Sequence, residues 1–189
     1  MPRVAVLDAC VLHPAPLRDL LVRVAAAGLV NARWTDDILD ECFRSILATR
    51  PDLKPDALVR TRALMNRAVP DARVDGHLAL VSKLVLPDPD DRHVLAAAIR
   101  CGAEVIVTRN LRDFPATELA KHGLRAEDPD DFVLRVVRSH GAAVARILEQ
   151  QANDLRSPPR SLDDLYGMLD QLGLTRAVRA LRTRGDRQG

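Results

Sequence analysis

Residues 4–8 read Val-Ala-Val-Leu-Asp. Four apolar residues, two of them β-branched, end directly at an acid, and continuous apolar runs of this length are typical of strands buried on both faces of a sheet. Residues 105–107 read Val-Ile-Val and are followed by Thr108. Because the chain between these runs shows helical periodicity, we expect an α/β fold with a parallel sheet flanked by helices.

Apolar residues at helical spacing mark the segments around the two strands. The positions between Leu17 and Val24 predict an amphipathic helix that ends near Gly28. Gly102 stands where a left-handed helix end belongs. Further helices, each beginning at a capping residue or a proline, are expected over residues 36–50, 55–65 and 91–101, and a short helix and a strand at residues 124–126 complete the α/β part.

From Asp130 onwards the sequence contains only helical patterns, interrupted at Ser157-Pro158-Pro159. We therefore expect an α/β domain over residues 1–132 and an all-helical C-terminal extension over residues 133–189. The extension carries 10 basic and 6 acidic residues, a net charge of +4. Its apolar stripe between Leu162 and Leu172 would be costly to expose, so we expect it to pack on the α/β domain or on a second copy of the chain in a homodimer.

The composition limits the kinds of partner. Hydrophobic residues make up 47% of the 189 residues and charged residues 29%, which excludes a disordered or collagen-like chain. The net charge of +2 is too small for long-range attraction to nucleic acid or membranes, and aromatic residues at 3% exclude base stacking as the main contact. The apolar runs are far shorter than the ~18 residues of a membrane span, so no membrane association is expected.

The three cysteines lie far apart without a CxxC pair, and no leader is recognisable before them, so a reducing cytoplasm suits the chain best. Cys10 follows the first strand, where a nucleophile could sit. The arginine that the phosphate loop of cysteine phosphatases requires is absent, because Pro16 occupies its position. Cys42 and Cys101 fall on apolar helix faces and are interpreted as inert core residues.

Polar residues follow both predicted strands at the edge of the sheet where ligands bind in parallel α/β folds. Asp8 ends the first strand, and Thr108, Asn110 and Asp113 follow the strand at residues 105–107. Two further acids, Asp91 at the start of the helix before that strand and Glu41 at the border of its helix's apolar stripe, are expected to join them.

Four carboxylates in one pocket repel one another and require a cation. An all-oxygen site favours Mg²⁺, with Mn²⁺ as a substitute, over Zn²⁺, which prefers imidazole and thiolate ligands. A carboxylate-bound Mg²⁺ activates water for attack on a phosphodiester. The acids therefore indicate hydrolysis of nucleic acid.

These segments resemble the successive motifs of PIN-domain ribonucleases, in the same order. The resemblance rests on Val-Leu-Asp-Ala-Cys-Val-Leu at residues 6–12, the helical Glu41, Asp-Pro-Asp-Asp-Arg-His-Val-Leu-Ala-Ala-Ala at 88–98, and Val-Thr-Arg-Asn-Leu-Arg-Asp-Phe at 107–114. It implies a PIN-like fold and a Mg²⁺-dependent endoribonuclease. In bacteria such a protein is most often the VapC-type toxin of a type II toxin-antitoxin pair, with RNA as substrate and a cognate antitoxin as partner.

Carried over residue by residue, the resemblance implies that the catalytic, metal-binding acids are Asp8, Glu41, Asp91 and Asp113, supported by Thr108 and Asn110. Asp90 remains an alternative to Asp91 as the third acid. The helical extension lies outside the common pattern of the family, so its role stays open.

Simpler interpretations exist for several of these residues. Asp91 could merely cap a helix, and Glu41 could be a solvated surface residue. His93 is interpreted as a solvated residue at a helix start. The arginines at positions 92, 109 and 112 could hold phosphates or simply belong to an arginine-rich surface.

Other functional classes fit the sequence less well than a nuclease. An aspartyl phosphatase is disfavoured because Cys10, and not a second aspartate, stands two positions after Asp8. Neither a GxGxxG after the first strand nor a GxxxxGKS/T is present, which argues against the corresponding nucleotide-binding folds. A catalytically degenerate PIN-like module that binds RNA or protein without cutting is the alternative that stays open.

Overall fold

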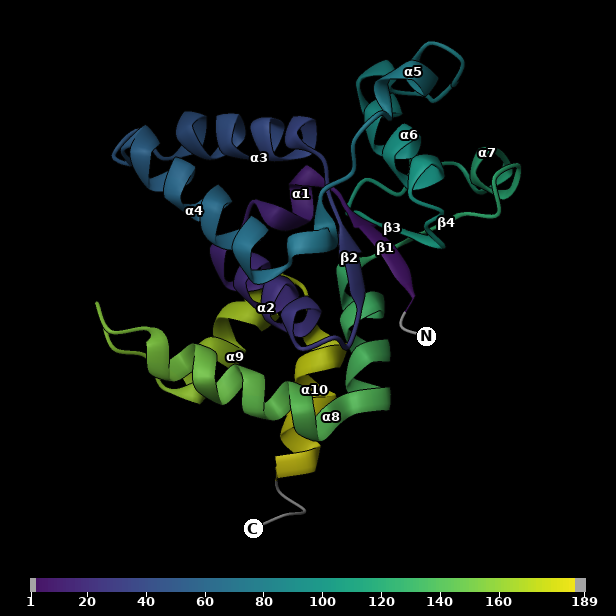
Figure 1. The fold of residues 1–189 in the computed structure, drawn as a ribbon. Helices are drawn as coiled ribbons and strands as arrows, with labels where there is room; N and C mark the ends of the chain where they lie inside the picture. The colour runs from purple at the N-terminus through teal and green to yellow at the C-terminus, as the bar shows by residue number, and fades with distance from the viewer. Residues whose placement is uncertain (1–2, 186–189) are drawn as a thin grey trace.

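A four-stranded parallel sheet forms the centre of the α/β part (Figure 1). The computed structural model describes residues 3–185, in which the strands lie in the order β2-β1-β3-β4. The strands are β1 Val4–Leu7, β2 Asn31–Arg33, β3 Val105–Val107 and β4 Arg125–Glu127. Every residue of the central strand β3 is buried, as expected when helices cover both faces of a parallel sheet. The predicted fold is confirmed.

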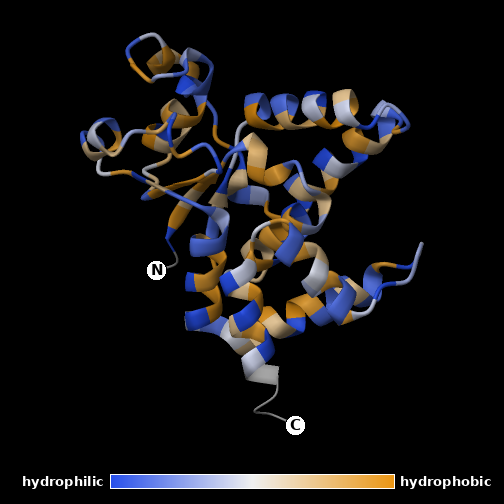
Figure 2. Cartoon of the chain, turned by 180° about the vertical axis from the view of Figure 1, so that it is seen from behind, coloured by the Kyte–Doolittle hydropathy of each residue, from blue (hydrophilic) through white to orange (hydrophobic). Residues whose placement is uncertain are grey.

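Helices connect the strands and cover the sheet. In the α/β part they are α1 Ala9–Leu12, α2 Ala15–Ala26, α3 Asp36–Thr49, α4 Pro55–Ala68, α5 Leu78–Val81, α6 Arg92–Arg100 and α7 Ala116–Ala120, with 3₁₀ turns at Pro70–Ala72 and Pro89–Asp91. α2 packs against β2, and α6 packs against β1 and β3. Figure 2 shows apolar residues along the strands and the inward sides of the helices, with hydrophilic residues on the outer sides.

The local signals read from the sequence act as expected. The Thr35 hydroxyl accepts a hydrogen bond from the Ile38 amide at 3.1 Å and so caps α3. Pro55 is the first residue of α4, and Gly102 follows α6 with a φ of 62°, in the left-handed region that glycine favours. The predicted starts of α3 and α4 and the predicted end of α6 are therefore confirmed.

The C-terminal extension consists of three helices, α8 Pro129–Asp154, α9 Leu162–Gln171 and α10 Thr175–Gly185. α8 and α9 pack against α2, and α10 packs against α8, which confirms that the extension packs on the α/β part. α8 is continuous through both predicted apolar faces but is kinked at His140, where φ is −136° and ψ is 33°. Residues 186–189 of the predicted extension lie outside the described residues. Between residues 3 and 185 no helix combines the length and apolar character needed to cross a membrane.

The buried carboxylate of Asp130 joins α8 to α10. It accepts hydrogen bonds from the backbone amides of Arg176 at 3.2 Å and Ala177 at 2.9 Å. It also accepts one from Nε of the Arg176 side chain at 2.8 Å. The first amides of a helix have no partners within that helix, so a carboxylate here satisfies donors that would otherwise be unpaired.

Replacing Asp130 by alanine should destabilise the fold. Asp130→Ala leaves the Ala177 amide buried without an acceptor, and we expect the free energy of unfolding in urea to fall by about 1–3 kcal/mol. Asp131→Ala is the matched control, because the Asp131 side chain is exposed and pairs with the Arg176 guanidinium on the surface. Its loss should cost no more than about 1 kcal/mol. Equal effects of the two substitutions would contradict the capping role of Asp130.

Candidate active site

Asp8 lies at the carboxyl end of β1, and its side chain is buried. One carboxylate oxygen accepts from the Ala9 amide at 2.6 Å, and the other from the Thr108 hydroxyl at 2.6 Å and the Cys10 thiol at 3.0 Å. Burial raises the pKa of Asp8, the bonds from Thr108 and Cys10 oppose that rise, and the charge of Glu41 adds to it. The carboxylate is therefore fixed in one orientation at an unfavourable position for a charge.

The Cys10 thiol acts as a hydrogen-bond donor in this arrangement. Burial, followed by the nearby charge of Asp8, raises the pKa of Cys10 to about 12, so the thiol stays protonated at neutral pH. A protonated thiol is a poor nucleophile. Cys10 thus helps to hold Asp8 in place and is not suited to covalent catalysis.

The loop after β3 is organised around Thr108. Its buried hydroxyl donates to Asp8 and accepts from the Asn110 amide at 3.0 Å, and the Asp113 amide donates to the Asn110 carbonyl at 3.0 Å. The loop therefore turns tightly and returns the half-buried Asp113 towards the strand ends. Three residues that follow β3 in the sequence are thereby tied to the acid that follows β1.

Asp91 stands at the start of α6, half-buried, and its side chain makes no capping hydrogen bond. The interpretation of Asp91 as a simple cap is therefore wrong. Asp88 instead accepts from the Asp90 amide at 2.9 Å and caps this turn. Asp90 itself is exposed.

The pKa of Asp91 shows that the predicted acids share one electrostatic environment. Burial, followed by the charges of four other acids in the order Asp8, Asp88, Asp113 and Glu41, raises this pKa to about 7. The other three predicted acids thus all act on Asp91, although they come from separate segments. Asp88 is a fifth contributor that the sequence reasoning did not single out.

Glu41 is not a freely solvated residue, because His93 contacts it. Its carboxylate lies 3.2 Å from Nε2 of His93, across the gap between α3 and α6. Burial by itself lowers the pKa of His93, but the hydrogen bond and charge of Glu41 outweigh it and the net shift is upward. The interpretation of His93 as a solvated histidine is wrong. Its position two residues after Asp91 was the available signal.

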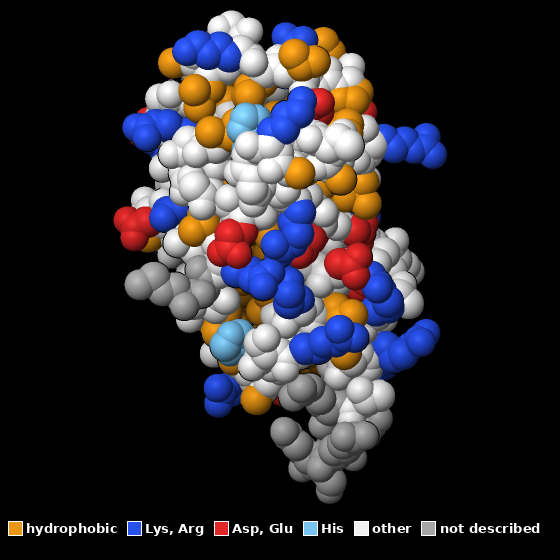
Figure 3. Space-filling view, turned by 90° about the vertical axis from the view of Figure 1, so that its right-hand side faces the viewer, with side chains coloured by type: hydrophobic (Ala, Val, Ile, Leu, Met, Phe, Trp, Pro, Cys, Tyr) orange, Lys and Arg blue, Asp and Glu red, His pale blue; other side chains and the backbone are white. Residues whose placement is uncertain are grey.

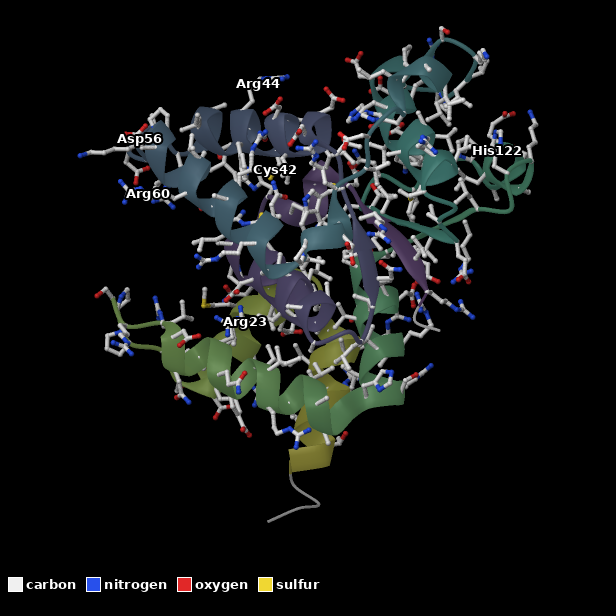
Figure 4. All side chains as sticks on the ribbon, viewed as in Figure 1. Arg23, Cys42, Arg44, Asp56, Arg60 and His122 are labelled. Atoms are coloured by element: carbon white, nitrogen blue, oxygen red, sulfur yellow. The ribbon has the colours of Figure 1, made fainter. Side chains whose placement is uncertain are left out.

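Other residues of α3 show which side of the helix faces the core. Cys42, the neighbour of Glu41, is buried and points from α3 towards α1, whereas the exposed Arg44 lies on the outer side of the helix (Figure 4). Burial raises the pKa of Cys42 to about 11, in keeping with an inert core thiol. Glu41 therefore sits at the border between the buried and exposed sides of α3.

A cleft of about 620 Å³ is lined by Glu41 and Asp91, whereas Asp8 and Asp113 are not among its lining residues. Arg44 is the one Lys or Arg residue among those that line it. The lining residues are Asp37, Asp40, Glu41, Arg44, Leu78, Val81, Asp88, Asp90, Asp91, His93 and Asn110. Arg62 pairs with Asp40, and His77 lies beside Asp37. Asp88, Asp90 and Asp91, however, place three like charges along the cleft that a cation would offset.

The donor set suits Mg²⁺ or Mn²⁺. Among residues 3–185, no three His, Cys, Asp or Glu side chains stand close enough together to hold a metal ion directly. Mg²⁺ usually takes one or two carboxylates and keeps several waters. Carboxylates that are spread over several segments and do not form a tight cluster match this mode, whereas Zn²⁺ would need a tighter set containing nitrogen or sulfur.

The PIN domain family model matches residues 4–112. The chain belongs to the PIN-domain family. A second family model, the VapC50 C-terminal domain, matches residues 129–183. The recognition made from the sequence is therefore confirmed, and the helices beyond the PIN domain correspond to a described family as well.

One relative is the protein named "Putative ribonuclease VapC50" of Mycobacterium tuberculosis (strain ATCC 25618 / H37Rv). It is 40% identical to this chain over 83 residues, which is 44% of this chain and 47% of the relative. The alignment thus spans about half the length of this PIN-domain relative. No solved structure matches the chain.

The raised pKa of Asp91 predicts that ionisation of this residue lowers the free energy of unfolding as pH rises. A carboxyl with a pKa of 3.8 when unfolded and about 7 when folded favours the folded state fully below the lower value, and this contribution is lost as pH rises through the higher one. In EDTA, Asp91→Asn should therefore become progressively more stable than wild type between about pH 4 and pH 7. Urea unfolding across this range measures the difference.

Asp90→Asn is the matched control for this experiment, because it removes an exposed charge from the same turn. An equal pH-dependent gain in Asp90→Asn would contradict the attribution to the burial and neighbours of Asp91. So would a difference between Asp91→Asn and wild type that stays constant with pH.

Proposed function

We propose that the chain is a Mg²⁺-dependent endoribonuclease, with Mn²⁺ as a substitute, that hydrolyses phosphodiester bonds in RNA. The observation that carries the proposal is the grouping of Asp8, Glu41 and Asp113 around the half-buried Asp91, where burial and the charges of these and Asp88 raise the pKa of Asp91 to about 7. Membership of the PIN-domain family and the ribonuclease named among its relatives support the same activity.

Asp8, Asp91, Asp113 and Glu41 would hold the metal partly through its bound waters, since no three acids of the described residues stand close enough to bind it directly. The Asp8 carboxylate has about four lone-pair positions, of which the Ala9 amide, the Thr108 hydroxyl and the Cys10 thiol occupy three. One position is thus left for the metal or its water. When bound, Mg²⁺ supplies Lewis acidity and lowers the pKa of a bound water.

The remaining residues of the site orient these acids and the substrate. Thr108 holds Asp8 and the start of the loop, and His93 holds the Glu41 carboxylate. Asn110 lines the cleft, where its amide can donate to a phosphate oxygen. We propose Asp91, rather than the exposed Asp90, as the third acid.

The division into parts and the partners belong to the same proposal. Residues 1–132 would form the nuclease and residues 133–189 the extension. Charges of both signs are interspersed on the face shown in Figure 3, so this face has no uniformly basic surface, and we propose that RNA is recognised at the cleft. We further propose that the chain is the cytoplasmic toxin of a bacterial toxin-antitoxin pair, whose antitoxin covers the cleft with a basic side chain.

Cleavage should require the metal and Asp8. We expect the purified protein to cleave RNA with Mg²⁺ or Mn²⁺ and to be inactive in EDTA. Residues that hydrogen-bond a metal ligand typically contribute 10- to 100-fold to activity. The cleavage activity of Asp8→Asn should fall by more than this, and that of the nearly isosteric Thr108→Val should fall by about this amount. A folded Asp8→Asn protein with wild-type activity would exclude the mechanism. Metal-dependent RNA binding without any cleavage would favour a non-cutting PIN-like module.

The toxin assignment has a separate test in cells. Expression of the wild type should arrest bacterial growth, and co-expression of the small protein encoded beside it should relieve the arrest. Asp8→Ala is the control, since it removes the buried acid at the end of β1. If Asp8→Ala arrests growth equally, or if the neighbouring protein gives no relief, the chain is not such a toxin even where cleavage in vitro is observed.

A further inference from the structure

The turn between α9 and α10 contacts the loop that carries Asn110 and Asp113. The Arg109 guanidinium donates through Nη2 to the carbonyl of Leu172 at 2.6 Å. Leu172 is the residue that ends α9, and a cation at this end of a helix satisfies a carbonyl that has no partner within the helix. The extension thus touches the candidate active site through a hydrogen bond from a charged donor.

The next residue, Gly173, gives the turn the backbone conformation that this contact uses. Its φ is 85°, which is in the left-handed region, and a Cβ placed on it would lie 3.5 Å from Nη1 of Arg109. The turn therefore presents the Leu172 carbonyl with the guanidinium packed closely over Gly173. A bulkier residue with an ordinary backbone would alter both features.

The backbone of Arg109 belongs to the network around Asp8. Its amide donates to the Cys10 sulfur at 3.3 Å, and the Cys10 thiol donates to Asp8 at 3.0 Å. Arg109 also stands between Thr108 and Asn110, whose hydrogen bond shapes the loop. One residue therefore connects the metal-binding acids to the extension.

The far side of the same turn is fixed as well. Asp130, in the first turn of α8, accepts from the amides of Arg176 and Ala177. α8 in turn begins directly after β4, whose Glu127 carbonyl accepts from the Thr108 amide at 3.0 Å. Residues 172–177 are thus held in place by α8. The Arg109 side chain can therefore fix the loop after β3 by bonding to them.

We propose that Arg109 is a positioning residue through which the C-terminal helices hold the loop that carries Asn110 and Asp113 in place beside Asp8. This inference rests on the proposed nuclease function and assigns a role to the extension in that function. The extension is then part of the machinery that orders the metal-binding acids.

Arg112 in the same loop shows why Arg109 is assigned to positioning and not to RNA binding. Arg112 is exposed and, within the described part of the chain, has no hydrogen bond or ion pair. Its guanidinium is available to a phosphate. The Arg109 guanidinium is already directed to a backbone carbonyl of the extension.

The test compares four full-length variants with wild type. Arg109→Ala removes the donor, and Arg109→Lys keeps a cation that can bond the last carbonyl of a helix. Arg112→Ala removes a charge from the same loop, and Arg182→Gln removes the Arg182–Asp163 ion pair of the extension, away from the loop. Three quantities are measured: hydrogen-exchange protection of amides 108–113, Mn²⁺ affinity by calorimetry, and kcat and KM for RNA.

For Arg109→Ala we expect loss of exchange protection in the loop and weaker Mn²⁺ binding. We also expect a fall in kcat of about 10- to 100-fold, as for a small misplacement of reacting groups, with KM nearly unchanged. Arg109→Lys should recover most of all three, and Arg182→Gln should behave as wild type. Arg112→Ala should leave loop protection and Mn²⁺ affinity unchanged.

Wild-type loop protection and Mn²⁺ affinity in Arg109→Ala would overturn the proposal. A rise in KM with kcat, protection and Mn²⁺ affinity unchanged would also overturn it, because Arg109 would then be an RNA ligand. Should the wild type cleave no RNA, the nuclease function fails, yet exchange and Mn²⁺ binding still decide whether Arg109 orders the loop.

Discussion

The 2.6 Å hydrogen bond from the Thr108 hydroxyl to the Asp8 carboxylate joins the ends of the two central strands. Both groups are buried, and a buried carboxylate is stable only when donors surround it. The parallel pairing of β1 with β3 places Leu7 opposite Val107, so the next residues of the two strands are Asp8 and Thr108. Because a shift of one residue would turn each side chain to the other face, this bond and the strand register require each other.

The acids around Asp8 illustrate a conflict between stability and function. Burial and like charges raise the pKa of both Asp8 and Asp91. The ionised carboxylates of the site therefore destabilise the metal-free fold. The hydroxyl, amide and thiol that bond Asp8 offset part of this cost. A fold selected for stability alone would not place these carboxylates together, which is the physical reason to assign them a function.

The sequence predicted the features that depend on local pattern. The continuous apolar runs at residues 4–7 and 105–107 indicated the central strands, and the acid or hydroxyl that follows each indicated the site. The edge strand β2, Asn-Ala-Arg, was not predicted, because its single apolar residue gives no strand signal and its pairing with β1 defines it. α5 was missed in the same way, since a single turn of helix has no period to detect.

The contacts that the sequence could not show are those between distant segments. Two examples are the contact of His93 with Glu41, 52 positions apart, and that of Arg109 with Leu172, 63 positions apart. The sequence around each residue gives no indication of its partner.

The interface between the extension and α2 has the same character. The buried Gln151 side chain of α8 donates to the Pro16 carbonyl at 2.9 Å, and Arg23 of α2 pairs with Asp154 at 2.8 Å. A specific hydrogen bond inside an apolar contact fixes one relative placement of the two parts, whereas apolar packing alone tolerates several. Asp8 caps α1, and α2 follows α1 after a short turn. The extension therefore packs on a helix that is close to Asp8 in the sequence. The extension is thus joined to the α/β part at two places, at the loop after β3 through Arg109 and at α2 through Gln151 and Asp154.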